Sequence, residues 1–112
     1  MISDETLKVL FDIANEREKQ KEANGYTPAH DDTHTQRELA RAANAYSLHY
    51  MQRSWVFVDR PAAYFEDFGA RDESCFPEDW KFTPTNPRED LVRAITLLVA
   101  EVERLDRQAL KL

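Results

Sequence analysis

The C-terminal stretch from residue 87 to residue 109 carries the pattern that most restricts the fold of this chain. Large apolar residues recur there at steps of four, three, four and three positions, the spacing of one face of an α-helix: Leu91, Ile95, Leu98, Val102 and Leu105. Asn86 stands at a capping position, and Pro87 suits the first helical position. The stretch therefore predicts a long helix whose apolar face is the seam of a bundle, so a charge at Leu98 should unfold the domain.

Two further stretches have helical periodicity. Between residues 4 and 23, which Ser3 can cap, the expected inward face holds Leu7, Leu10, Phe11 and Ala14. Between residues 33 and 51 the inward face alternates small and large side chains, so a neighbouring helix can approach closely: Leu39, Ala42, Ala43, Tyr46 and Tyr50. The short connection makes these helices antiparallel neighbours. We therefore predict one all-α domain spanning residues 1–112, a three-helix antiparallel bundle.

The second and third predicted helices are joined by a long aromatic, acidic connector. Residues 52–85 lack a helical period and are interrupted by prolines and Gly69, so their structure is not predicted from the sequence. Their acidic side chains form either a solvated face or a docking surface for a basic protein partner. These candidate interaction residues are Glu66, Asp67, Asp72, Glu73, Glu78 and Asp79.

Composition narrows the function classes. The formal net charge is −6 and no cluster of Lys and Arg occurs, so direct nucleic-acid binding is not expected. The single cysteine, Cys75, excludes an internal disulfide and a zinc site built on cysteine pairs. No apolar stretch approaches the roughly 18 residues of a membrane span, and the acidic N-terminus does not resemble a secretion signal. We therefore expect a soluble, cytoplasmic protein that does not associate with membranes.

Unusual polar chemistry is concentrated between residues 25 and 38. His30 and His34 are interleaved with Asp31 and Asp32, and Glu38 follows His34 at a spacing of four. On a helix starting near residue 32, this spacing would place His34 and Glu38 on one face. Histidine and carboxylate ligands suit Zn, Mn, Fe or Ni, so His30, His34 and Glu38 are a candidate set for a divalent metal.

A structural interpretation explains the same residues without a ligand. Asp31 and Asp32 would cap the second helix, and Thr35 with Glu38 has the spacing of a capping box. Both interpretations remain open at the level of the sequence.

The first helix supplies the rest of the candidate site. Arg17 and Gln20 continue its inward face beyond the last apolar residues, and Glu16 lies beside them. Because antiparallel packing brings this end close to the second helix, we expect Arg17 near Asp31, Asp32 or Glu38, as a structural counter-ion or an anion clamp. The complete candidate polar site is Glu16, Arg17, Gln20, His30, Asp31, Asp32, His34 and Glu38.

Four strings of the chain carry a resemblance to known proteins. They are ERxKQ at residues 16–20, GYTPxHDDxH at 25–34, ELAxAAxxY at 38–46 and RxDLVRAxxLLxAEVERLDR at 88–107. In these strings the chain resembles an uncharacterised group of small proteins encoded by bacteriophages and prophages. The resemblance implies a phage or prophage origin and no particular biochemical activity.

Two functions follow as hypotheses. The first is a phage-type helical protein that acts by protein interaction through the acidic connector, modulating or inhibiting a host system. The alternative is a small metal-dependent hydrolase acting on a nucleotide or a related phosphorylated small molecule, because the acid-rich helices resemble those of all-α nucleotide pyrophosphohydrolases. Those enzymes bind Mg²⁺ through paired ExxE and ExxD signatures; Glu103 and Asp106 have the ExxD spacing, which a solvated outer face also explains. Three leucines lie off the apolar stripe, where they either cover the connector or form a homodimer contact: Leu97, Leu110 and Leu112.

Overall fold

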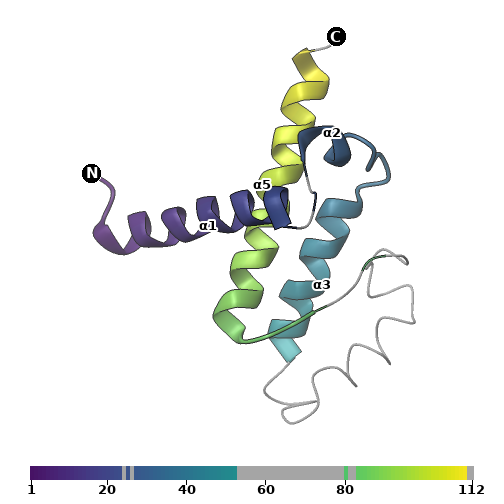
Figure 1. The fold of residues 1–112 in the computed structure, drawn as a ribbon. Helices are drawn as coiled ribbons and strands as arrows, with labels where there is room; N and C mark the ends of the chain where they lie inside the picture. The colour runs from purple at the N-terminus through teal and green to yellow at the C-terminus, as the bar shows by residue number, and fades with distance from the viewer. Residues whose placement is uncertain (24, 26, 53–79, 81–82, 111–112) are drawn as a thin grey trace.

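All regular structure is helical in the part of the chain that the computed structural model describes, residues 1–23, 25, 27–52, 80 and 83–110. The helices are α1 (Asp4–Ala23), α2 (Pro28–Asp31), α3 (Glu38–Gln52) and α5 (Pro87–Leu110) (Figure 1). The predicted all-α class is therefore confirmed. None of the helices described is both long and apolar enough to cross a membrane.

The starts of α1 and α5 follow the capping signals of the sequence. Ser3 Oγ accepts a hydrogen bond from the Thr6 amide at 3.2 Å, and Asn86 Oδ1 accepts one from the Glu89 amide at 3.0 Å. Polar side chains at these positions satisfy amides that have no partner within the helix. The predicted ranges of these two helices, 4–23 and 87–109, agree with the structure to within one residue.

The middle helix begins later than the sequence indicated. We expected it to start near residue 33, whereas residues 32–37 are not helical and α3 starts at Glu38. Arg37, directly before α3, has a φ of 62°, in the left-handed region that helices exclude. Thr35 is too far from the first helical residue to cap α3, so the predicted capping box is wrong.

The core lies between α3 and α5, which run antiparallel and side by side (Figure 1). Alanines on both helices allow this close approach, and larger side chains fill the flanks. The buried cluster is Leu39, Ala42, Ala43 and Tyr46 of α3 with Ala94, Leu97 and Ala100 of α5, and Trp80 packs against it. The predicted packing face of residues 39–46 is confirmed, whereas Tyr50, expected on that face, is 42% exposed.

Helix α1 does not join an antiparallel three-helix bundle. Figure 1 shows it crossing α5 at a steep angle, with its N-terminal half projecting away from the other helices. Its buried residues are Ile13, Arg17 and Gln20. Leu7, Leu10 and Phe11, which we expected to face inward, are 48%, 48% and 65% exposed. A helix that crosses another contacts it over only a few turns, so the outer part of α1 remains in solvent.

Helix α5 is rotated relative to the prediction. The expected seam is largely at the surface, because Ile95, Leu98, Val102 and Leu105 are all exposed. The buried face has the same heptad spacing displaced by one residue: Asp90, Ala94, Leu97, Glu101 and Arg104. Because Leu98 is exposed, the expectation that a charge at this residue unfolds the domain is wrong. Leu97, which the prediction placed off the apolar stripe, lies in the core instead.

Most of the predicted connector, residues 52–85, lies outside the described residues, which include only Gln52, Trp80 and residues 83–85 of its length. The six acidic residues proposed as an interaction surface are among those outside: Glu66, Asp67, Asp72, Glu73, Glu78 and Asp79. That part of the fold prediction stays a prediction.

Candidate functional site

The histidine–aspartate stretch is organised by the single turn of α2. Thr27 takes an extended conformation (φ −74°, ψ 162°) and its side chain accepts a hydrogen bond from the His30 amide at 3.3 Å. Pro28 follows in the first turn, where its missing amide hydrogen costs nothing. The turn ends at Asp31, the residue of α2 that is fully buried.

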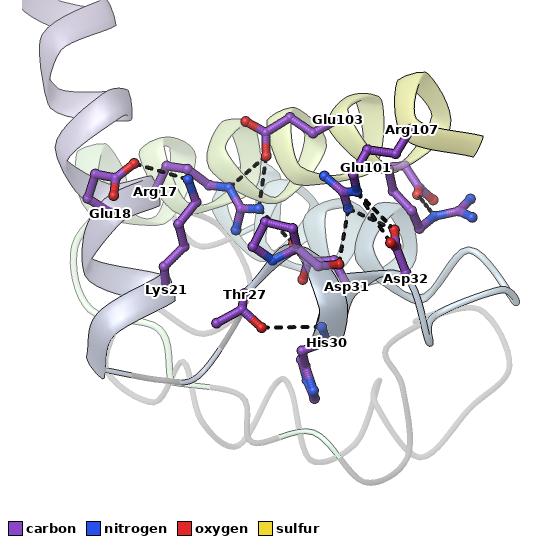
Figure 2. Close-up of polar contacts among 12 residues, drawn as sticks. Arg17, Glu18, Lys21, Thr27, His30, Asp31, Asp32, Glu101, Glu103 and Arg107 are labelled. Carbon is purple, nitrogen blue, oxygen red and sulfur yellow. Dashed lines mark hydrogen bonds and ion pairs between the residues drawn. The ribbon is translucent and has the colours of Figure 1, made fainter. Parts of the chain in front are cut away.

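Asp31 is buried because Arg17 of α1 reaches it. Arg17 Nη2 lies 2.7 Å from Asp31 Oδ2, and Arg17 Nε donates to Glu103 Oε1 of α5 at 3.0 Å (Figure 2). The Arg17 side chain is only 4% exposed, and that of Asp31 is 0% exposed. One guanidinium therefore joins α1, α2 and α5, and the predicted proximity of Arg17 to Asp31 is confirmed. Because its donors already bind two carboxylates, the geometry favours a structural counter-ion over an anion clamp.

Asp32 makes a second link between α2 and α5. Arg107 Nη2 donates to Asp32 Oδ1 at 2.8 Å and to the Pro28 carbonyl at 3.2 Å (Figure 2). The hydrogen bonds to the Asp32 carboxylate raise the pKa of the Arg107 guanidinium above its ordinary value. Neither Asp31 nor Asp32 caps α3, so the structural interpretation of these aspartates as caps is wrong. Their structural role is to hold α2 against α1 and α5.

His34 lies at the centre of a small ring cluster. Its ring meets the rings of His30 and Trp80 edge-on, with centroids 4.8 and 4.9 Å away. His34 Nδ1 is 3.3 Å from Glu38 Oε2, so this pair is close together even though the turn before α3, and not a helix, connects the two residues. The other polar atoms of these two side chains, His34 Nε2 and Glu38 Oε1, are buried and have no hydrogen-bond partner among the residues described.

Metal binding at this cluster stays a prediction. Within the described ranges, no three side chains of His, Cys, Asp or Glu are grouped so that they could hold a metal ion. The structure thus brings His34 and Glu38 together as a pair and sets the His30 ring against His34, without adding a third ligand from the described residues.

The two remaining candidates on α1 lie apart from each other. Gln20 is buried, and its Oε1 has no partner among the residues described. Glu16 lines an open cleft on the other side of the crossing, together with Asp12, Lys19 and Arg88. Gln20 therefore remains a candidate for the polar site, whereas Glu16 belongs to a different surface.

Sequence reasoning missed the buried charges of α5. Arg104 Nε donates to Glu101 Oε1, and both side chains are about nine-tenths buried. Asp90 is fully buried and accepts a hydrogen bond from the Thr85 amide at 2.8 Å. The sequence did contain a signal for this buried face, the heptad spacing of positions 90, 94, 97, 101 and 104. The neighbouring stripe has the same spacing and more apolar residues, so the sequence favours it as the buried face instead.

Comparisons of the chain with models of protein families, with curated proteins and with solved structures found no match. The resemblance to phage-encoded proteins therefore stays a prediction.

Proposed function

We propose that the protein acts by binding a protein surface through an exposed apolar face that α1 and α5 build together. We call this face the apolar corner and define it by seven exposed side chains: Leu7, Leu10, Phe11, Ile95, Leu98, Val102 and Leu105.

The crossing of α1 and α5 lies next to both halves of the apolar corner. Leu10 of α1 and Val99 of α5 line one pocket at the crossing. Arg88, which precedes Ile95 by one heptad, donates from Nη2 to Asp12 Oδ2 of α1 at 2.8 Å. This contact indicates that the outer half of α1 leaves the crossing on the side of α5 that carries the exposed seam.

The distribution of side chains on α5 is the observation that carries the proposal. Its buried face includes two alanines and three charged residues, whereas its exposed face presents leucine, isoleucine and valine. Exposed large apolar side chains are ordinary when scattered, but a contiguous group of them marks a binding surface. A face this apolar is expected to be covered when the protein functions.

The sequence indicates what kind of partner this interaction would have. The resemblance of the four strings to phage-encoded proteins supports a partner within a host system, which the protein would modulate or inhibit. The acidic connector remains a further candidate surface, but it lies outside the described residues, so the proposal rests on the apolar corner.

Thiol labelling tests whether the corner is covered. In a Cys75→Ser background, Leu98→Cys places one thiol in the corner, and Asn44→Cys places one on the exposed side of α3 as a matched control. We expect rapid labelling of both in dilute protein, and protection of position 98 alone in concentrated protein or in a bacterial lysate. Equal labelling of both positions under every condition would overturn the proposal.

The second candidate function, a metal-dependent hydrolase acting on a nucleotide or a related phosphorylated small molecule, is supported by the unpartnered atoms His34 Nε2 and Glu38 Oε1. Such buried atoms can bind a ligand. Calorimetric titration with Zn²⁺ or Mn²⁺ tests it: stoichiometric binding that is lost in His34→Ala would favour the hydrolase, and absence of binding to the wild type would remove it.

A further inference from the structure

We infer that the partner seated on the apolar corner is a second copy of this chain, an inference that rests on the proposed function. The two copies are related by a two-fold axis. The outer half of α1 in each copy covers the exposed seam of α5 in the other.

Both sides of the required helix–helix contact are present on one molecule. Ile95, Leu98 and Val102 have the three- and four-residue steps of a seam that accepts apolar side chains from a facing helix. The outer half of α1 offers such side chains at positions i, i+3 and i+4: Leu7, Leu10 and Phe11. Because α1 projects away from the other helices (Figure 1), it does not cover the seam of its own chain. With a two-fold axis, α1 of each copy covers the α5 seam of the other copy, so both seams are buried in one interface.

The area of the corner fits a dimer of this chain. Phe11, Leu98 and Val102 are 65%, 47% and 57% exposed, and the other four members are between 39% and 50% exposed. Seven large apolar side chains at such exposures present on the order of 600 Å² of surface. A standard interface buries about 800 Å² on each partner, of which about 65% is apolar in homodimers. The apolar area of the corner on one copy therefore matches the apolar area that one partner buries in a standard homodimer interface. It also lies at the upper end of the apolar patch area that a monomeric protein leaves exposed.

Charge also favours this face for contact between identical chains. Each copy has a formal net charge of −6, so two copies repel each other over most of their surface. The seven side chains of the corner are uncharged, as expected for the centre of an interface. Added salt screens the repulsion and should strengthen self-association, whereas salt would weaken a contact with a basic partner.

Measurement of mass tests the dimer. Light scattering and sedimentation of the full chain, at about 1 to 100 μM, should give twice the chain mass of 13.1 kDa. Leu98→Glu and Leu10→Glu, each checked for helicity by circular dichroism, should raise the dimer dissociation constant by at least about thirty-fold, the effect of losing one strong interface residue. Asn44→Glu, which adds the same charge on the exposed side of α3, should leave the mass unchanged. If Leu98→Glu fails to fold, Leu98→Ser replaces it.

Cross-linking tests the pairing of α1 with α5. In the Cys75→Ser background, chains carrying Leu10→Cys are mixed with chains carrying Val102→Cys under mild oxidation. We expect the mixed disulfide to form faster than either symmetric one. A dimer that yields chiefly symmetric disulfides would overturn this pairing.

The two proposals fail in different ways. A wild type that stays monomeric over the whole concentration range overturns the self-association. If position 98 is nevertheless protected in lysate, the corner binds another protein and the proposed function stands. If the chain dimerises while position 98 still reacts freely, both proposals about the corner are wrong.

Discussion

The strongest test of the described fold is removal of the buried guanidinium of Arg17. Arg17→Met keeps most of the length and apolar volume of the side chain but removes the charge that faces Asp31 and Glu103. Since Arg17 joins α1, α2 and α5, the substitution acts on all three helices.

The expected cost follows from the burial of the pair. Removing one partner of a buried ion pair typically destabilises a protein by about 3–5 kcal/mol, because the other charge is left without compensation. Asp31 is 0% exposed and cannot recover its hydration without local opening. Glu103 is 38% exposed, so water replaces much of its interaction with Arg17. For a domain of this size, the loss corresponds to a decrease of about 12–20 °C in Tm.

Urea unfolding followed by circular dichroism measures this loss. Arg88→Met is the matched control, since Arg88 makes an ion pair of similar length with Asp12 but has a side chain 58% exposed, and we expect almost no change. The double variant Arg17→Met/Asp31→Leu should regain much of the stability, because it leaves no unpaired charge at Asp31. A cost below about 1 kcal/mol for Arg17→Met, or a double variant as unstable as the sum of the single changes, would refute the reasoning.

Two further predictions concern the register of α5 and the surface ion pairs. Leu97→Ala should lower the free energy of unfolding by about 2–5 kcal/mol and Leu98→Ala by less than about 1 kcal/mol in the monomer; equal losses would contradict the observed register. Hydrogen bonds from Lys8, and then from Arg88, hold the pKa of Asp12 below its ordinary value of 3.8. The charged carboxylate therefore stabilises the fold above pH 3.8, and this contribution is lost as the pH falls through the lowered pKa. Carbon-13 NMR titration should show a midpoint below 3.8 that Lys8→Ala raises more than Arg88→Met does; a midpoint that neither changes would show that these contacts are absent in solution.

The candidate site was predictable only in part. The proximity of Arg17 to Asp31 followed from chain order, because the end of the first helix and the start of the next must lie close together. The position of α2 did not follow, since a four-residue helix has too few residues for a periodic pattern. One of the two sequence interpretations made Asp31 and Asp32 caps, because capping is the usual role of aspartate before a helix. They pair instead with Arg17, as chain order indicated, and with Arg107, which no local signal shows will reach Asp32 from the last helix.

The sequence alone determined the bounds of α1 and α5, because periodicity and capping are local properties. Ser3, Asn86 and Pro87 mark the starts of α1 and α5 whatever those helices pack against. The sequence also determined the packing face of α3, since its alanines leave one face that a neighbouring helix can approach closely.

Only the tertiary structure decided which face of α5 is buried. Two stripes with heptad spacing run along this helix one residue apart, and the more apolar one is exposed. The other stripe fits against α3 because Ala94, and Ala100 beside it, allow close approach. Its charged residues also have partners, as Glu101 has in Arg104. Burial of a charge is tolerated only when a partner is in place. Whether the partners of buried charges will be in place depends on how the helices pack, and a periodic pattern carries no information about that.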